Sequence, residues 1–338
     1  MASLSFLLGM IPATEKVESA DDQLRADFEA YNSYEASEEF KHFLDLEKEI
    51  KSSDFALRKR KIKKKEYKDS EEFQKETEYK VLKKSEKVQW YFRTKKKYPF
   101  KEIEKWNQTF DEKFNESKLD TSRWMTRYFW GDQAFKASFA LEDDQSFPTD
   151  GANIEFYDKK ARIVTRAEDA EGLVWRSEQG FVKEPFDYTS GLISTAKSFK
   201  QKYGIFKAKI KMAEGAVAQS FWMVGEQMLP HIDVARFENG RLYANYFWGK
   251  GKSPRKSISK TGGGRYADEY FIYTLEWSPN KLVWKINDKV FKVQTSGVPQ
   301  EEMYISFSAN LKKGASADDL PSAMEIDWVR AYKLKEKA

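Results

Sequence analysis

The sequence predicts an all-β sandwich preceded by an α-helical N-terminal domain, because two stretches of the chain have different patterns. Residues from about 20 to 106 are rich in lysine and glutamate, contain no glycine, and place apolar side chains at helical spacing. From about Phe110 onward, short segments alternate apolar and polar residues between Gly, Asn, Asp and Pro turns. We therefore divide the chain into an apolar N-terminal segment (1–20), a helical domain (21–107) and a β-sandwich (108–335).

The composition of the 338-residue chain argues against several kinds of site. Without cysteine there are no disulfides or thiolate ligands, and with only His42 and His231 we expect neither a zinc site nor a cofactor. The formal net charge of +5 is small, so an anionic partner would need a local basic patch. No stretch approaches the ~20 apolar residues of a membrane span, so we expect none.

The N-terminal segment Leu4–Ile11 is apolar but short, and no basic residues precede it. It is interpreted either as a weak or truncated secretion signal or as an apolar segment that docks on the protein or on a partner. Both interpretations stay open at this point.

The helical domain is predicted from an apolar stripe and from repeated helix starts. The stripe consists of Phe40, Phe43, Leu46 or Leu44, and Ile50. A serine followed by two glutamates, a favourable helix start, occurs at Ser37 and again at Ser70, and Lys51-Ser52 is repeated at Lys84-Ser85. These repeats indicate a duplicated helical unit of about 33 residues. We expect two to four helices, packed as hairpins or against the next domain, that offer a surface for a protein partner.

A basic run from Arg58 to Lys65 lies within this domain. It is typical either of a surface that binds an anionic partner or of a solvated helix face balanced by nearby acids, and we favour the second interpretation. Because no aromatic residue interleaves the run, no stacking platform is present and we expect no nucleic-acid partner.

The β-sandwich is predicted from segments with period-two alternation, such as Gly204–Met212, Phe271–Trp277 and Lys281–Asn287. Many such segments at short intervals favour an antiparallel sandwich. Asn287-Asp288, between two of them, predicts a tight hairpin turn.

These segments, in order, resemble glycoside hydrolase family 16, the family of laminarinases, agarases and carrageenases. The resemblance rests on Phe110–Asn115 with Trp124, Tyr188-Thr189-Ser190-Gly191, Tyr203–Lys211, Phe221-Trp222-Met223, Tyr273–Trp277, Val283–Asn287 and Met324–Tyr332. It implies a concanavalin-like jelly roll over 108–335, a polysaccharide ligand, and an exported or cell-surface protein. It also implies a structural calcium in some members, for which Asp327 matches a closing-strand aspartate, although one oxygen ligand is not a site.

The segment His231–Arg236 departs from the family pattern. At this place the family carries Glu-x-Asp-x-x-Glu, whereas the aligned positions here are His231, Asp233 and Arg236. A retaining endo-acting glycosidase needs two carboxyl groups ~5–5.5 Å apart, and arginine does not exchange a proton at ordinary pH. A bulge would place the three on one face of a strand, with Glu238 farther along. We therefore assign no catalytic residue, and we expect an Asp233–Arg236 ion pair and a His231 that either binds a sugar hydroxyl or packs.

Candidate glycan contacts are aromatic faces, with polar groups that fix the hydroxyls. Trp175 next to Arg176, and Tyr246 and Trp248 within the run Tyr243–Trp248, join His231, Asp233 and Arg236 as candidates. For each aromatic residue, core packing is the alternative. The loop with Lys250, Lys252, Arg255 and Lys256 suits a sulfated or uronic glycan, or is simply a basic surface loop.

Three functional hypotheses follow. The first is a non-catalytic member, a pseudoenzyme, that binds a β-glucan or galactan in the jelly-roll cleft. The second is a structural or assembly protein, such as a cell-surface or virion component, that contacts its partner through the helical domain or the N-terminal segment. The third is a divergent O-glycosyl hydrolase. The fold alone does not choose between them, because function depends on the site.

Overall fold

The computed structural model describes residues 11–249, 254–262 and 266–336. The chain forms two compact units, of which one spans Glu18–Trp106 and the other combines the N-terminal segment up to Val17 with the chain from Asn107 onward. Each unit has its own hydrophobic core. Within the described ranges, no helix is both long enough and apolar enough to cross a membrane.

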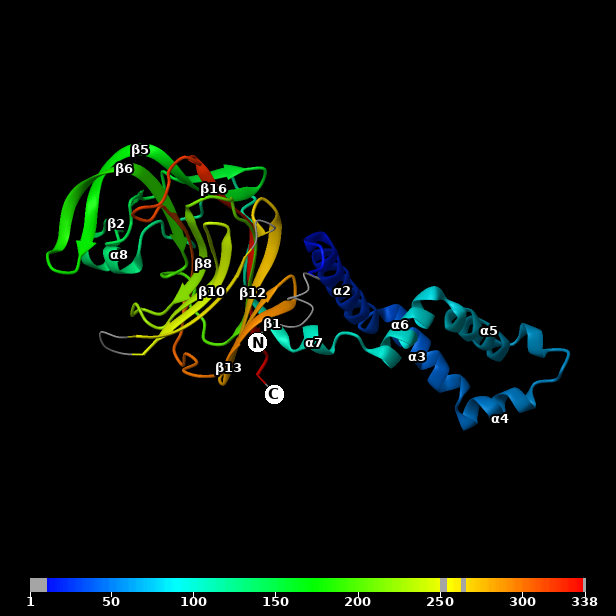
Figure 1. The fold of residues 1–338 in the computed structure, drawn as a ribbon. Helices are drawn as coiled ribbons and strands as arrows, with labels where there is room; N and C mark the ends of the chain where they lie inside the picture. The colour runs from blue at the N-terminus through cyan, green and yellow to red at the C-terminus, as the bar shows by residue number, and fades with distance from the viewer. Residues whose placement is uncertain (1–10, 250–253, 263–265, 337–338) are drawn as a thin grey trace. The chain divides into compact units, whose positions relative to one another are not determined.

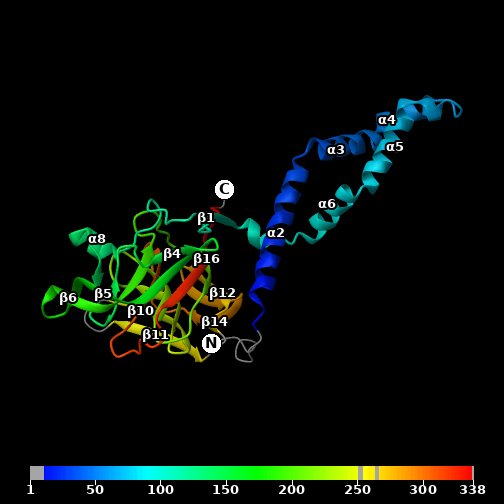
Figure 2. The same cartoon turned by 90° about the horizontal axis from the view of Figure 1, so that it is seen from above.

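The first unit, called the helical unit here, contains more helices than the two to four expected. They are α2 (Thr14–Glu35), which begins before the unit, α3 (Glu38–Ile50), α4 (Ser53–Lys61), the 3₁₀ turn η1 (Tyr67–Asp69), α5 (Glu71–Lys84), α6 (Glu86–Lys97) and the short α7 (Lys101–Glu104). The expected number is wrong because serines interrupt each of two longer arms. One arm, α3 followed by α4, is joined through a turn to the other, α5 followed by α6 (Figure 2).

Four serines cap these helices in the same way. The hydroxyl oxygens of Ser37, Ser52, Ser70 and Ser85 accept from the backbone N–H three residues later, at 3.2, 3.1, 3.2 and 3.3 Å. Each bond satisfies a helix N–H that has no partner within the helix. The predicted helix starts at Ser37 and Ser70 are confirmed, and the four caps have the spacing of the predicted duplication.

The core of the helical unit is aromatic. Tyr91 is fully buried and stacks on Tyr31, with ring centroids 4.9 Å apart, and it contacts Phe40 at 4.3 Å. On α3, Leu46 is buried whereas Leu44 is 41% exposed, so Leu46 completes the predicted stripe with Phe40 and Phe43. The buried face of α3 therefore follows the helical period read from the sequence.

The second unit, called the β unit, is an antiparallel β-sandwich of the jelly-roll type, as predicted (Figure 1). Its strands are β1 (Trp106–Glu112), β2 (Phe139–Ala140), β3 (Phe147–Pro148), β4 (Ile154–Tyr157), β5 (Lys160–Arg176), β6 (Gly180–Ser194), β7 (Gly204–Lys211), β8 (Ala218–Val224), β9 (His231–Glu238), β10 (Arg241–Trp248), β11 (Arg255–Gly262), β12 (Tyr270–Ser278), β13 (Lys281–Ile286), β14 (Lys289–Gln294), β15 (Tyr304–Asn310) and β16 (Ser322–Leu334), with one helix, α8 (Phe129–Phe135). The hydrogen-bonded order is β11-β10-β9-β8-β15-β6-β5-β16-β7-β12-β13-β14. The long strands β5 and β6 join the two layers.

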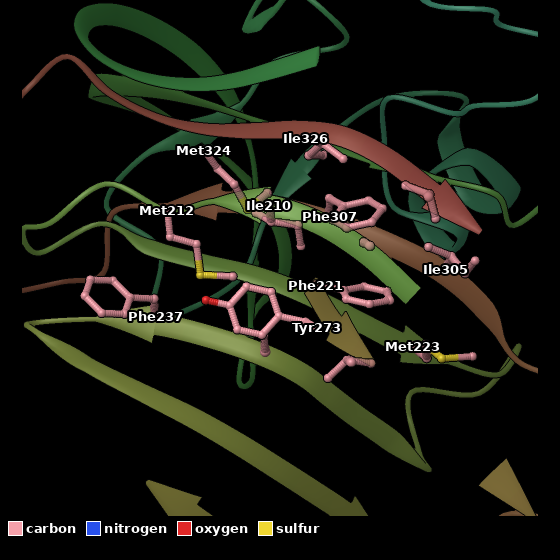
Figure 3. Packing of buried hydrophobic residues seen from close by; sticks show 14 of the residues in the cluster. Ile210, Met212, Phe221, Met223, Phe237, Tyr273, Ile305, Phe307, Met324 and Ile326 are labelled. Atoms are coloured by element: carbon pink, nitrogen blue, oxygen red, sulfur yellow. The ribbon is translucent and has the colours of Figure 1, made fainter. Parts of the chain in front are cut away.

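The core of the β unit lies between the two layers. Phe221 of β8 and Phe307 of β15 stack at 4.9 Å, and they face Ile210 of β7 and Tyr273 of β12 from the opposite layer (Figure 3). Because side chains alternate along a strand, every second residue of β8–β11 points away from this core. We call that outer side of β8–β11 the cleft face.

The predicted hairpin turn at Asn287-Asp288 is confirmed. Both residues have positive φ, 44° and 62°, and they join β13 to β14. Positive φ at both central positions is the requirement of the tight turn that suits the twist of two antiparallel strands.

Candidate functional site

Strand β9 contains a β-bulge that sets which of its side chains face the cleft. On the neighbouring strand, Trp222 lies opposite Asp233 and Phe221 lies opposite Ala235, so Val234 is the additional residue. Val234 and Ala235 both belong to the core. The bulge therefore brings His231, Asp233 and Arg236 onto one face, as the sequence analysis expected for a bulged strand.

A pocket of about 830 Å³ lies on the cleft face. Strand β9 supplies one wall, β10 and β11 supply a second, and a loop from Lys312 to Ser316 supplies a third. The lining side chains include His231, Asp233, Arg236, Glu238, Tyr243, Asn245, Phe247, Ile258, Asp143, Lys312 and Lys313. Positively and negatively charged side chains and the rings of Tyr243 and Phe247 thus line the same pocket.

Asp233 forms the base of the pocket and is only 3% exposed. Its Oδ1 lies 2.9 Å from His231 Nε2, its Oδ2 accepts from Asn245 Nδ2 at 2.8 Å, and its backbone oxygen accepts from Trp284 Nε1 at 2.9 Å. Burial alone would raise the pKa of the Asp233 carboxyl, but the charges of His231 and Arg236 and the two side-chain hydrogen bonds outweigh it. The pKa of Asp233 is therefore below its ordinary value, and the carboxylate stays ionised at neutral pH.

The expected ion pair between Asp233 and Arg236 is wrong. Arg236 Nη2 donates instead to Glu238 Oε2 at 2.6 Å, because the two residues lie two positions apart on the same face of β9. Burial lowers the pKa of Arg236, but the charges of Asp233 and Glu238 raise it by more. The pKa of Arg236 is therefore above its ordinary value, and the guanidinium stays charged. Asp233 takes His231 as its partner.

His231 both packs and lines the pocket. Its ring stacks on Trp222 at 5.2 Å with an interplanar angle of 17°, and Phe247 meets its edge at 6.0 Å. With Nε2 bonded to Asp233, the imidazole is fixed in orientation. The ring contacts show that His231 packs, and its binding of a sugar hydroxyl stays a prediction.

Beyond His231, an apolar cluster covers the cleft face. Trp222 and Val224 of β8 are buried there with Tyr128, Phe139 and Tyr304. Trp222 Nε1 donates to Ser308 Oγ at 3.1 Å, which satisfies this buried indole. The open part of the cleft face is therefore the part over β9, β10 and β11.

Trp175 and Arg176, which were predicted glycan contacts, do not line this pocket. Trp175 is 41% exposed at the end of β5 and contacts the edge of Phe181 at 4.9 Å. Arg176 forms an ion pair with Glu184 across the β5–β6 hairpin and donates to Glu142 O at 3.0 Å. The structure gives Arg176 a role in holding the hairpin.

Tyr246 and Trp248 also point away from the cleft face. Their rings stack at 4.7 Å with an angle of 8°, and Tyr246 is fully buried in the core of the β unit. They line a separate hollow of about 1000 Å³ together with Met228 and Gly297. The prediction placed them in the cleft because of their strand, whereas the two-residue period of β10 turns them to its other side.

The cleft-facing residues of β10 are Tyr243, Asn245 and Phe247. The two aromatic residues were part of the run singled out in the sequence, but Asn245 was missed, as were Lys312 and Lys313. The period of two along β10 could have identified Asn245, because it lies between two cleft-facing aromatics. Lys312 forms an ion pair with the buried Asp144, and no local pattern predicts that contact. Lys250 and Lys252 lie outside the described residues.

Asp327, the candidate calcium ligand, lies on β16, and its Oδ2 is 2.8 Å from Lys209 Nζ. Over the ranges that the structure describes, no group of three or more His, Cys, Asp or Glu side chains is arranged to hold a metal ion. A carboxylate already paired with a lysine is a poor start for a calcium site, which takes several oxygen ligands.

The fold and the pocket define a β-sandwich protein with an open pocket on the outer side of one sheet. The sequence model of glycosyl hydrolases family 16 matches residues 142–330, which is more than half of the chain. The chain therefore belongs to glycosyl hydrolases family 16.

Similar proteins match about two thirds of the chain at low identity. The chain is 23% identical to glucan endo-1,3-beta-glucosidase A1 of Niallia circulans, over 67% of this chain and 38% of that protein. It is 24% identical to endo-1,3-1,4-beta-glycanase ExsH of Rhizobium meliloti strain 1021, over 68% of this chain and 52% of that protein. The chain thus spans about half or less of these relatives' length.

Among solved structures, the catalytic domain of the laminarinase from Thermotoga petrophila RKU-1 matches with a TM-score of 0.54 and 17% identity. The match covers 68% of this chain and 99% of that one. At this identity the likeness shows the fold.

Proposed function

We propose that the pocket on the cleft face binds a β-linked polysaccharide, a β-glucan or a galactan, without the retaining hydrolysis of the family. Asn245 carries the proposal. It is 7% exposed, its Nδ2 is committed to Asp233, and its Oδ1 finds no hydrogen-bond partner among the residues that the structure describes. A buried acceptor without a partner is costly, and a sugar hydroxyl that enters the pocket would donate to it.

The rest of the pocket suits a sugar ring. Tyr243 and Phe247 flank Asn245 on the same face of β10 and offer apolar surface, while Arg236 and His231 offer polar atoms. Saccharide sites combine these two kinds of group. One of the relatives named above is a glucan endo-1,3-beta-glucosidase and the other an endo-1,3-1,4-beta-glycanase, which supports a β-linked glycan as the ligand here.

Loss of retaining hydrolysis is proposed from the charge pattern of β9. The resemblance to the family aligns its two catalytic glutamates with His231 and Arg236. Of the carboxylates on β9, Asp233 is buried and bonded to His231 and Asn245, and Glu238 is bonded to Arg236. These two carboxylates therefore do not supply the nucleophile and the acid that a retaining mechanism requires.

Affinity electrophoresis in gels that contain laminarin, agarose, κ-carrageenan or porphyran tests the proposal, with product release from each polymer measured in parallel. The wild type should be retarded by at least one polymer and release no oligosaccharide. Asn245→Ala should weaken that binding by about tenfold, the equivalent of one hydrogen bond. The matched control is Asn107→Ala, an exposed position on β1.

Two results would contradict the proposal. If no polymer retards the wild type, the cleft is not a binding site for this class of ligand. If oligosaccharides are released and Asp233→Asn abolishes their release, the protein is a divergent hydrolase.

A further inference from the structure

The turn that joins α4 to α5 carries a concentration of positive charge that the cleft does not explain. We define the hairpin tip as residues 58–68. Within it, Arg58 and Lys59 are balanced by acids of neighbouring helices. Arg58 contacts Glu49 at 2.8 Å and Glu72 at 3.2 Å, and Lys59 pairs with Glu76.

The other basic residues of the tip are exposed and are not balanced in this way. They are Arg60, Lys61, Lys63, Lys64, Lys65 and Lys68. No ion pair is found for any of them within the described part of the chain, and Glu66 is the one acid within the tip itself. The interpretation favoured from the sequence, a face balanced by acids, therefore holds for Arg58 and Lys59 but not for the rest of the run.

The tip is held in place before any partner arrives. Tyr67 Oη donates to Glu76 at 2.6 Å, and Lys75 Nζ lies 2.9 Å from Glu49, so the base of the turn is tied to α3 and α5. Phe55 of α4 is buried beneath the tip. Because these contacts restrain the turn that presents the lysines, binding would cost less conformational entropy than it would for an unrestrained basic tail.

The chemistry of the tip selects among anionic partners. Its single aromatic residue, Tyr67, has its hydroxyl bonded to Glu76 and its ring 5.0 Å from Lys59 Nζ, so no free platform exists for stacking nucleic-acid bases. An interfacial membrane helix needs an apolar face, but in α4 Phe55 is buried and Leu57 is the exposed apolar side chain. Lysines as point charges suit the sulfate or carboxylate groups along a polysaccharide.

We propose that the hairpin tip is a second carbohydrate-contact surface, which binds an anionic polysaccharide bearing sulfate or uronic-acid groups. The surface is separate from the pocket on β9–β11, and it would act whether or not that pocket binds sugar.

The test measures binding of the full chain to dextran sulfate, with uncharged dextran as the reference polymer, over a series of NaCl concentrations. The variant Arg60→Gln/Lys61→Gln/Lys63→Gln/Lys64→Gln should bind dextran sulfate about tenfold more weakly and with a shallower salt dependence. The matched control, Lys84→Gln/Lys96→Gln/Lys97→Gln/Lys101→Gln, changes the same charge on exposed positions of the same unit and should bind within about threefold of the wild type. Circular dichroism verifies that both variants keep their helices.

Equal weakening in the two variants would overturn the proposal, because it would show a general charge effect. Binding to single-stranded DNA or to phosphatidylserine vesicles that is tighter than to dextran sulfate would overturn the assigned partner class. Asn245→Ala separates this inference from the function proposed for the cleft. It should leave dextran sulfate binding unchanged, while the tip variant should leave the binding of an uncharged polymer such as laminarin unchanged.

Discussion

The helical unit and the β unit place their charged side chains in opposite ways. In the helical unit the ion pairs lie on the surface, as in Lys87–Glu39 and His42–Glu78, where both side chains are largely exposed. In the β unit some charged groups are buried, among them Asp233, which is 3% exposed, and Lys292, which is 4% exposed. Exposed pairs contribute little to stability, whereas a buried charge must have partners.

Asp233 and Lys292 are connected through Trp284. Its Nε1 donates to the backbone oxygen of Asp233, and Lys292 Nζ lies 4.7 Å from its ring. Lys292 Nζ also donates to Ala244 O at 2.8 Å and to Ser257 O at 2.7 Å, and so joins β14 to β10 and β11. The base of the cleft is thus supported by contacts between distant strands, whereas the helix starts of the helical unit are capped by serines three residues away. Substitutions in the two units should therefore differ in the size and kind of their effect.

The largest effect is expected where the β unit's scaffold is kept and its chemistry is changed. The double variant His231→Glu/Arg236→Glu places carboxylates on both sides of Asp233, on the face that the bulge already presents. We expect it to release oligosaccharides from the polymer that the wild type binds, at least about a hundredfold more than its control does, because proton transfer and nucleophilic attack become available. Reducing-end assays with mass spectrometry of the products measure this.

The control is His231→Gln/Arg236→Gln, which makes the same changes of size without adding carboxylates. If both double variants are equally inactive while still folded and binding, the cleft differs from a hydrolase in more than these two side chains. That result would contradict the proposal that hydrolysis is missing because His231 and Arg236 stand where the family has glutamates.

A smaller effect is expected from the buried lysine of the β unit. Burial lowers the pKa of Lys292 from 10.5 to about 8, and the charge of Asp233 only partly opposes this. Between about pH 8 and 10.5 the native protein has lost this proton and the unfolded chain still holds it, so the free energy of unfolding rises with pH. Over that window the wild type should gain about 3 kcal/mol relative to Lys292→Met, which has no proton to lose.

Urea unfolding at several pH values from 7 to 10.5 checks this expectation. Lys281→Met, at an exposed position at the start of β13, is the matched control, and its stability difference from the wild type should not change with pH. Parallel pH curves for the wild type and Lys292→Met would mean that Lys292 titrates as an exposed lysine does.

The same contrast explains what could be predicted from the sequence of the β unit. The sandwich and the Asn287-Asp288 turn follow from periods and turn chemistry that are local. The period of two places His231 and Asp233 on one face, but Arg236 joins them only through the bulge, which was considered because of the family resemblance. Lys292 reaches carbonyls 48 and 35 positions away, and no local pattern contains that information. The error at Tyr246 and Trp248 has a different cause, because the period of β10 was sufficient to choose Tyr243 and Phe247 instead.

In the helical unit the local signals were more complete. A serine followed by acids predicts a helix cap in which the serine hydroxyl accepts from the backbone N–H three residues later. The caps at Ser37 and Ser70 form as expected. The sequence did not show which lysines of the run Arg58–Lys65 are balanced, because their partners Glu49, Glu72 and Glu76 lie on other helices. Local structure was readable, and the pairing of charges between helices was not.

The smallest effect should come from removing one of these local caps. Ser52→Ala and Ser85→Ala occupy equivalent places in the two arms, and each should lower the free energy of unfolding of the helical unit by about 1 kcal/mol, because one helix N–H loses its acceptor. The β unit should be unaffected, since neither serine contributes to its core.

Ser53→Ala is the control, because Ser53 is the first helical residue and its neighbour Ser52 provides the cap. Native-state hydrogen exchange reports both units in one sample. Equal losses at Ser52 and Ser85 would support two equivalent arms, and a loss that spread into the strands would show that the units unfold together and that the contrast between them does not extend to stability.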